Sequence, residues 1–575
     1  MGRFYRHALK RIPHLDRSRL DQRLDRTRDS LQALLRGRLN RLPLYRPFRR
    51  MLAAVSQLLT HRGYARALIS LSLDRLPLGW GADLRRTCYV WSERVRRTRA
   101  GMAHRSYIRD YSFDEEQLRA FALILDRLEL TVPPNKLLAV LRKRMMLSEW
   151  NGLVALLDFV ARTHSPQCDH RGAAIVNASD LGPRACRDHR RRNILFITGE
   201  FPNRMHGGGG RLMDFIKIMS RDNDIYLYSW FDGRDDAATC QELAAYCKKM
   251  TRVHFGEFEG SLERLREFVG DVPMDIVHYE WPRSLTNYDP AWGKHHVFTY
   301  MEVVSLRLRM DLTAEPPLSN RWFSTLIEVL GGLQVEIVNA AKADSHIVVT
   351  RKDGEFLSRF TPNRSYLILN HGVNLDEFCL PEQSPEPHTL VFTGNFLHYP
   401  NEDAVRFFFD KIFGDLQARI PDVRVYLVGV NPSRRIWRYH DNRHVFVTGA
   451  VDDIRPYIQR ATVCIAPLIS GAGLRSKVIQ YAALKRACVA TSVAATDLLF
   501  EDGKDIFIAD DPRVFAERVL YLLEKPDAAR QMAESAFGQV QKYYDNRKLV
   551  GDLYRIYAGL ENLQSRRLNA NNGNT

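Results

Sequence analysis

The stretch PLISGAGLRSKVIQYAALKRACVATSVAA, residues 467–495, decides the fold of this chain. A short apolar run precedes it at residues 462–466, and a second such run, residues 487–491, follows its helical pattern. Short apolar runs rich in β-branched residues are typical of buried strands. The order is therefore strand, glycine-containing loop, helix and strand, which predicts a parallel sheet with helices packed on it.

The loop of this unit carries the residues expected to do chemistry. Ser470, Gly471 and Gly473 are small, and Arg475 and Lys477 place two cations at the start of the helix. A helix N-terminus presents unpaired N–H groups and partial positive charge, and glycine lets a ligand approach the backbone. This combination favours a diphosphate site. The alternative is that both cations belong to a solvated helix face.

The rest of the chain extends the same alternation into two halves. Strand-like runs lie at residues 193–199, 226–230, 276–279, 297–300, 347–350 and 366–369, and again at 389–393, 423–428, 445–447 and 506–508. We predict an α/β protein with two doubly wound, Rossmann-like parallel sheets, at residues 193–375 and 389–562, joined by a proline-bearing linker. Ligands of such folds bind at the carboxyl ends of the strands, which places a cleft between the halves.

Composition sets the broad class. The chain has 575 residues, 45% of them hydrophobic and 26% charged, which is ordinary for a globular protein. Its 8 cysteines show no disulfide-framework spacing and favour a reducing compartment. No apolar run reaches the ~18 residues of a membrane span, and the N-terminus lacks the apolar block of a secretory signal. We expect a cytoplasmic protein.

Positive charge is concentrated at the N-terminus. The net charge is +17, and residues 1–100, with 24 basic and 7 acidic residues, account for all of it. Arginines flank a leucine stripe in residues 20–42, as in an amphipathic helix. Three interpretations stay open for this basic α-helical domain, residues 1–165: solvated charge, docking on an anionic membrane surface, and polyanion binding. No nucleic-acid motif is present, so we rank the membrane above nucleic acid.

Two further segments have their own signatures. Helices are predicted after SFDE (residues 112–115), a capping-box pattern, and at about residues 135–146 and 149–162. Residues 166–192 are predicted to be a linker, and 563–575 a disordered tail. The linker contains Cys168, His170, Cys186 and His189, whose spacing fits no common zinc pattern, so we predict no metal site.

The N-terminal half has candidate ligand-binding residues of its own. Gly208, Gly209 and Gly210 end a glycine run that opens a helix, where an anion or a sugar could bind. The run lacks the spacing of a dinucleotide fingerprint, and a flexible surface loop is the alternative. His278 and Glu280 lie at a strand end and are predicted to face the cleft, where either could orient an acceptor hydroxyl. A core histidine with satisfied hydrogen bonds is the alternative for His278.

Residues 193–562 resemble a GT-B glycosyltransferase of the large retaining family 4, similar to the bacterial exopolysaccharide sugar transferases. The blocks that carry the resemblance are ITGEFPNRMHGGGGRLMDF, VVTRKDGEFL, ILNHGVNLDEF, FTGNFLHYPNEDAVRFF, VTGAVDDIRPYIQRATVCIAPL and GLRSKVIQYAALKRACVATSVAA. The resemblance implies metal-independent transfer, without a cofactor, of a sugar from a nucleoside-diphosphate donor in the C-terminal half to a lipid-linked or glycan acceptor in the N-terminal half. With such a function, we expect the arginine-rich residues 1–100 to dock on the inner face of the cytoplasmic membrane, where lipid-linked acceptors would be presented.

The resemblance assigns roles residue by residue. It makes Arg475 and Lys477 the cations that stabilise the leaving diphosphate, Gly394 and Asn395 the second phosphate-side turn, and the backbone of Val451 a nucleobase contact. Gln480 stands where relatives commonly have a ribose-binding glutamate, and it keeps one acceptor oxygen without the charge. A degenerate GT-B scaffold that binds partners or a polyanion is therefore the alternative function.

Overall fold

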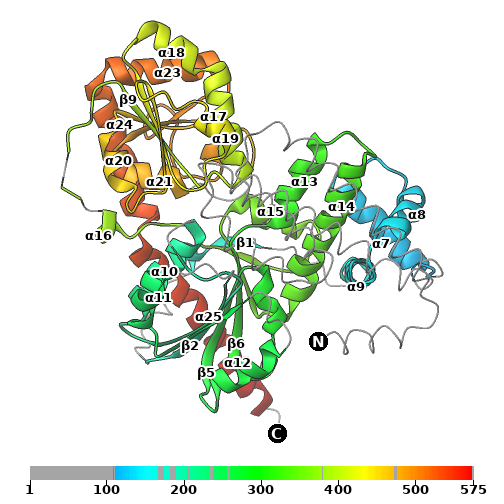
Figure 1. The fold of residues 1–575 in the computed structure, drawn as a ribbon. Helices are drawn as coiled ribbons and strands as arrows, with labels where there is room; N and C mark the ends of the chain where they lie inside the picture. Colours follow the sequence, from blue (N-terminus) through cyan, green and yellow to red (C-terminus); the bar gives the residue numbers. More distant parts are fainter. Residues whose placement is uncertain are drawn as a thin grey trace, which may run out of the picture. The chain divides into compact units, whose positions relative to one another are not determined.

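The computed structural model describes residues 108, 111–165, 174–181, 190–203, 207–231, 237–254, 260–378, 380–381, 383–471 and 476–572. Residues 112–575 form one compact unit. The arginine-rich stretch and the expected linker cysteines and histidines lie outside the described residues. Two all-parallel sheets organise the described part of the chain, and we call the parts built on them the N-lobe and the C-lobe (Figure 1).

The N-lobe sheet has eight strands in the order β1-β8-β7-β6-β5-β2-β3-β4, all paired in parallel. The strands are β1 (Ile175–Asn177), β2 (Asn193–Thr198), β3 (Asp224–Phe231), β4 (Lys249–His254), β5 (Met274–Glu280), β6 (Gly293–Tyr300), β7 (Ser345–Val348) and β8 (Tyr366–Ile368). Its helices are α10 (Gly207–Met219), α11 (Ala237–Ala244), α12 (Ser261–Val269), α13 (Val304–Ala314), α14 (Asn320–Leu333) and α15 (Arg351–Ser358). Continuous apolar runs form its central strands because both faces are covered.

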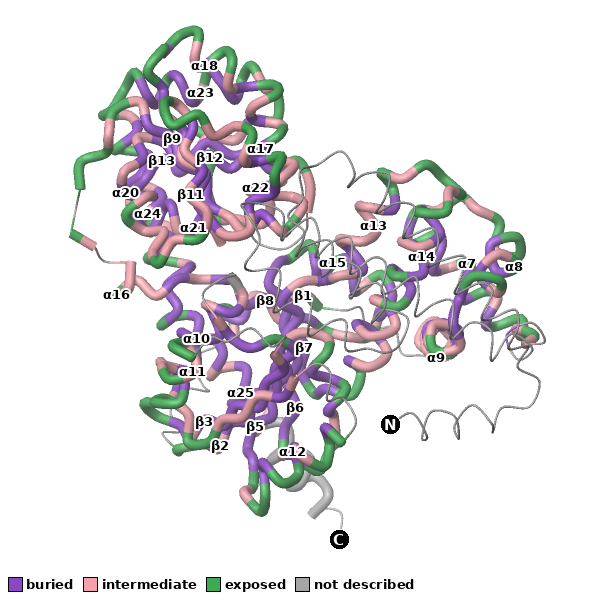
Figure 2. The backbone as a smooth tube through the Cα atoms, viewed as in Figure 1, coloured by how far each residue is buried: buried purple, intermediate pink, exposed green. Residues whose placement is uncertain are grey.

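The C-lobe sheet has six strands in the order β11-β10-β9-β12-β13-β14, again all parallel. They are β9 (Thr389–Thr393), β10 (Arg424–Val428), β11 (Val445–Gly449), β12 (Val463–Ala466), β13 (Ala487–Ala490) and β14 (Phe507–Ile508). The helices are α17 (Tyr399–Lys411), α18 (Phe413–Arg419), α19 (Arg434–Trp437), α20 (Arg455–Arg460), α21 (Ser476–Ala483), α22 (Ser492–Ala495), α23 (Pro512–Glu524) and α24 (Pro526–Tyr543). The predicted fold class, two parallel sheets of α/β type, is confirmed. Buried residues concentrate on the strands of both lobes (Figure 2).

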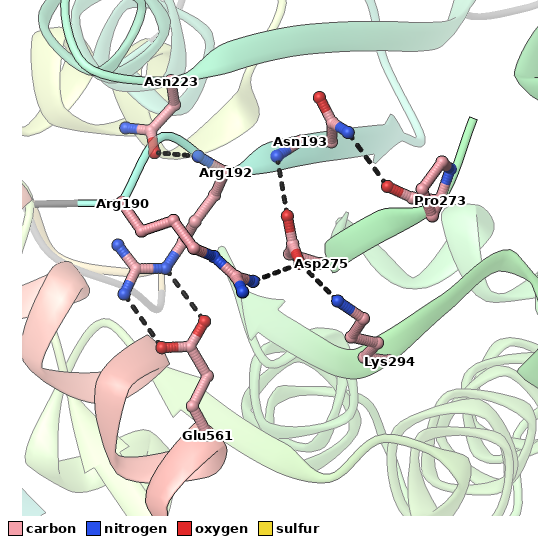
Figure 3. Close-up of polar contacts among 8 residues, drawn as sticks. All are labelled: Arg190, Arg192, Asn193, Asn223, Pro273, Asp275, Lys294 and Glu561. Atoms are coloured by element: carbon pink, nitrogen blue, oxygen red, sulfur yellow. Dashed lines mark hydrogen bonds and ion pairs between the residues drawn. The ribbon is translucent and has the colours of Figure 1, made fainter. Parts of the chain in front are cut away.

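The last helix, α25 (Asn546–Asn572), packs on the N-lobe, although it follows the C-lobe in the chain. Leu549, Leu553 and Tyr557 belong to the apolar core that α10 and strands β2, β3 and β5 build. Arg192, just before β2, holds Glu561 of α25 through Nε and Nη2, at 3.0 and 2.9 Å (Figure 3). The C-terminal half was predicted to span residues 389–562, but its last part, α25, belongs to the N-lobe in the structure. An amphipathic helix packs wherever its apolar face is covered, and this can be on a lobe distant in sequence.

Asp275 ties the amino ends of the N-lobe strands together (Figure 3). Its carboxylate accepts from the backbone N–H of Asn193 at 3.0 Å and lies 2.7 Å from both Arg190 Nη2 and Lys294 Nζ. Burial raises the pKa of this carboxyl, but the contacts with Lys294, Asn193 and Arg190 lower it more, so the net shift is downward. This end of the sheet is the one opposite to the carboxyl ends where ligands of such sheets bind.

Other predicted boundaries also shift. Within the expected linker, β1 pairs in parallel with β8, and the expected tail is helical as far as Asn572. Helices α7 (Glu115–Arg127), α8 (Pro134–Arg144) and α9 (Leu147–Thr163) are close to their predicted ranges, and α9 packs against α14 of the N-lobe. The capping box is two residues later than predicted: Asp114 caps α7 and pairs with Gln117. Strands β1 and β4 were missed because they are short or half-exposed.

Candidate functional site

A cavity of about 420 Å³ lies at the carboxyl ends of β9 and β10 and takes walls from both lobes. Its N-lobe wall includes the first turn of α10. Its C-lobe wall includes the turns after β9 and β10, the segment before α20, and the first turns of α21. The lining residues are Gly210, Arg211, Asp214, Gly372, Val373, Glu377, Phe378, Thr393, Gly394, Asn395, His398, Asn401, Val428, Gly429, Val430, Val451, Asp452, Asp453, Ile454, Arg455, Ser476, Lys477 and Gln480. The predicted cleft is thus a cavity at the expected sheet edge.

Two glycines let the ends of β9 and β10 pass close to each other. The N–H of Gly394 donates to the carbonyl of Val428 at 3.0 Å. Gly429 has φ 147°, and a Cβ there would lie 1.9 Å from the carbonyl oxygen of Gly394. A side chain at this position is therefore incompatible with the turn, since real Cβ contacts are far longer. The turn brings bare backbone to the cavity wall.

Lys477, the second residue of α21, is a cation on the C-lobe wall. Its Nζ donates to Oδ1 of Asn401 at 2.7 Å and lies 4.0 Å from the ring centroid of Phe392. The amide of Asn401 in turn donates to the carbonyl of Asn395 at 2.8 Å. A side-chain amide therefore positions the ammonium group at the amino end of α21.

The start of α21 is fixed against β9 by a buried tyrosine. The backbone N–H of Thr393 donates to the hydroxyl of Tyr481 at 2.9 Å, and the Thr393 hydroxyl lies 3.0 Å from it. Tyr481 is fully buried, and burial raises the pKa of its phenol well above the ordinary value. The hydroxyl is thus a permanent hydrogen-bond partner that keeps the α21 N-terminus and the β9 turn in one geometry.

The structure brings together most of the predicted donor-side residues that it describes. Gly394, Asn395, Val451, Lys477 and Gln480 all line the cavity. Ser470 and Gly471 are half-buried and do not line it. Gly473 and Arg475 lie outside the described residues. Sequence reasoning missed Asn401; the signal was a polar side chain in the first turn of the helix that follows β9.

On the N-lobe wall, the glycine run opens α10 as predicted, and Gly210 is the member of the predicted trio that lines the cavity. A Cβ added at Gly210 would meet nothing within 4 Å. Gly208 and Gly209 precede it in the helix and do not line the cavity. The next residue, Arg211, also lines the cavity although it is only 2% exposed.

The charge of Arg211 faces a buried carboxylate. Its Nη1 lies 3.6 Å from Oε1 of Glu280, and its guanidinium lies 4.4 Å from the ring centroid of Phe215. Burial lowers the pKa of Arg211 and raises the pKa of Glu280 to about 7, while the attraction between the two groups opposes both shifts. This is a buried ion pair that desolvation weakens.

His278 lies beside this pair and does not face the cavity. Its Nδ1 is 2.6 Å from the hydroxyl of Tyr557, and its Nε2 is 2.6 Å from Oγ1 of Thr299. Burial, followed by the nearby charge of Arg211, lowers the pKa of His278 to about 3, so the ring is neutral. The expectation that His278 and Glu280 face the cleft differs from the structure: both are buried and neither lines the cavity. For His278, the alternative interpretation of a satisfied core histidine fits.

Metal-ligand clusters and membrane-spanning helices are absent from the part of the chain that the structure describes. Among the described residues, no group of three or more histidine, cysteine, aspartate or glutamate side chains could hold a metal ion. No helix of the described ranges is long and apolar enough to cross a bilayer.

Part of the C-lobe is similar to a known protein family. Residues 387–525 match the family model described as "Glycosyl transferases group 1". Over 199 residues the chain is 20% identical to an uncharacterised 44.6 kDa protein in the cps region of Klebsiella pneumoniae. That match covers 33% of this chain and 50% of the Klebsiella protein, so the chain spans half the length of this curated relative.

Solved structures of low identity are similar to about two thirds of the chain. Sucrose-phosphate synthase from Thermosynechococcus elongatus is 14% identical with a TM-score of 0.49, over 65% of this chain and 100% of that one. HepE from Anabaena, in complex with UDP and glucose, is 12% identical with a TM-score of 0.49, over 64% of this chain and 100% of that one.

Proposed function

We propose that this chain is a glycosyltransferase that moves a sugar from a nucleoside-diphosphate donor to a lipid-linked or glycan acceptor in polysaccharide or glycoconjugate synthesis. The observation that carries the proposal is the position of Lys477. It lies at the amino end of α21, lines the cavity, and belongs to the region that matches the glycosyl transferases group 1 model. The partial positive charge of the helix end adds to the ammonium charge at one point.

In the proposed reaction, the diphosphate lies between the first turn of α21 and the turn after β9. Lys477, positioned by Asn401, offsets the negative charge that grows on the diphosphate as the bond to the sugar breaks. A positioned cation of this kind contributes several kcal/mol of transition-state stabilisation. Arg475, two residues earlier, is proposed as the second cation. The nucleoside extends toward Val451, and Gln480 accepts a hydrogen bond from the ribose.

The finer features are part of the same proposal. The transfer is metal-independent and retaining and needs no cofactor beyond the nucleotide sugar. The protein is cytoplasmic, and its arginine-rich residues 1–100 hold it at the anionic inner face of the cytoplasmic membrane, where each cation near the surface contributes about 1 kcal/mol. Sedimentation with anionic and neutral vesicles at low and high salt, with and without residues 1–100, tests the membrane part separately.

A ligand panel tests the proposal directly. The full chain is titrated with UDP, GDP, ADP and TDP, and the unfolding temperature is measured. A nucleotide at 100 times its Kd should add about 2.7 kcal/mol of stability. A response to at least one nucleotide that Lys477→Met abolishes supports a donor site. A flat response to all four favours the alternative, a degenerate scaffold that binds partners or a polyanion.

A further inference from the structure

One nitrogen of the Arg211 guanidinium, Nη1, contacts other side chains. The other two, Nε and Nη2, form an edge that has no hydrogen-bond partner among the described residues. Nη1 lies 3.3 Å from Sδ of Met301 and 3.6 Å from Glu280, which is beyond hydrogen-bond length. Both nitrogens of the edge are buried. A buried donor without a partner costs about 1–3 kcal/mol, and more when the group is charged. The two unsatisfied donors therefore lower the stability of the folded protein, and a ligand that accepts hydrogen bonds from them would remove this cost.

The position of Arg211 indicates where a ligand group would come from. Arg211 is the fifth residue of α10 and lines the cavity beside Gly210, where an added Cβ would meet open space. The helix end adds partial positive charge at the same place. A guanidinium edge without a hydrogen-bond partner in the described part of the chain thus lies near the amino end of a helix at the N-lobe wall, apart from Lys477 on the C-lobe wall.

The geometry points to a carboxylate-bearing sugar as the ligand of the N-lobe wall, with Arg211 as the residue that recognises the carboxylate. Nε–H and Nη2–H are the two parallel donors of a guanidinium edge, and this spacing fits the two oxygens of a carboxylate. This inference rests on the proposed function, in which the diphosphate occupies the C-lobe wall. The acidic sugar is either the one that is transferred or the one that accepts it.

The donor arm of the test compares nucleotide sugars that differ in one group. Isothermal titration of the full chain measures Kd for UDP-glucose against UDP-glucuronate, and for GDP-mannose against GDP-mannuronate. A carboxylate paired with Arg211 should tighten binding about tenfold or more, the size of one charged hydrogen-bonded contact. The acceptor arm repeats the comparison with glucose and glucuronate while the nucleoside diphosphate that binds is saturating.

The variant Arg211→Lys tests the role of the guanidinium, since lysine keeps the positive charge but cannot form the bidentate hydrogen bonds. We expect it to reduce the preference for the acidic sugar to about twofold or less, without changing the Kd of the free nucleoside diphosphate. The matched control is Arg486→Lys. Arg486 is a buried arginine of the C-lobe that donates to the carbonyls of Gln459 and Gln383 and does not line the cavity, so its variant should keep the preference.

Each outcome decides a separate question. A preference for the acidic sugar in either arm, lost in Arg211→Lys, supports the inference. Equal binding of acidic and neutral sugars in both arms overturns it, even if the variant does not fold, because wild-type protein is enough for that comparison. Weaker binding of the free nucleoside diphosphate by Arg211→Lys would also overturn it, by assigning Arg211 to the diphosphate. Absence of nucleotide binding altogether refutes the proposed function and this inference with it.

Discussion

The two walls of the cavity hold their cations in opposite ways. On the C-lobe wall, Lys477 is half-buried and hydrogen-bonded to a neutral amide, Asn401. On the N-lobe wall, Arg211 is 2% exposed and faces a buried carboxylate, Glu280. The loss of one partner of a buried ion pair is strongly destabilising, whereas the loss of a half-buried side chain costs less stability. The comparison predicts that removal of the cation lowers the unfolding free energy much more on the N-lobe wall than on the C-lobe wall.

The largest expected effect is on folding, from Arg211→Met. Removal of the guanidinium leaves the Glu280 carboxylate buried without its counterion, and we expect a loss of about 3–5 kcal/mol of unfolding free energy in urea denaturation. The double variant Arg211→Met with Glu280→Met removes both charges and should recover most of that loss. If the single and double variants lose the same unfolding free energy, the unpaired Glu280 carboxylate is not the cause of the loss.

Lys477→Met should produce the reverse pattern. We expect the affinity for the nucleoside diphosphate to fall about 100-fold, or roughly 2.7 kcal/mol, since a positioned cation is lost from a partly desolvated site. The unfolding free energy without ligand should change by less than about 1 kcal/mol, because the side chain is half-buried. Lys504→Met, at an exposed ion pair with Glu501, is the control. A large loss of stability in Lys477→Met would remove the contrast between the walls.

The pH dependence of the unfolding free energy tests whether burial raises the pKa of the Glu280 carboxyl. Burial raises the pKa of Glu280 to about 7, so between about pH 4.5 and 7 the folded state binds more protons than the unfolded state. Stability from this group is therefore complete below pH 4.5 and is lost as the pH rises through 7, by about 1–3 kcal/mol. His278, with a pKa lowered to about 3, acts oppositely and loses stability as the pH falls below 6.5.

The difference between wild type and Glu280→Gln isolates the carboxylate, because His278 is present in both. In urea titrations, the unfolding free energy of wild type minus that of the variant should decline as the pH rises from about 4.5 to 7.5. Parallel pH profiles for the two proteins would contradict the raised pKa.

Asn401 should give the smallest effect. Asn401→Ala leaves the Lys477 ammonium in place but without its positioning amide, and we expect nucleotide affinity to fall about fivefold to tenfold. Asn401→Asp should weaken binding further, because a carboxylate at the 2.7 Å contact offsets the Lys477 charge. Titration of both variants with the same nucleotide measures the order. If Asp binds as tightly as wild type, Asn401 does not set the charge of the site.

The sequence determined the sheets and the C-lobe wall, because both depend on local patterns. Apolar runs predict the buried strands from β2 to β13, apart from β4, and small residues before an amphipathic helix predict the position of Lys477. The same logic placed Gly394 and Asn395 directly after β9. Each prediction depends only on residues that are close in sequence, and these residues are enough to fix the position of the strand ends and of Lys477.

Tertiary structure alone decided which side chains meet across long sequence distances. Arg211 and Glu280 come from α10 and β5, Tyr557 reaches His278 from a helix that returns to the N-lobe, and Asn401 reaches Lys477 from α17. The strand-end position of His278 and Glu280 suggested the cleft, yet burial directed both inward. Burial and partner choice are properties of the packed lobes, where desolvation and distance set the energies, and no local pattern in the chain specifies them.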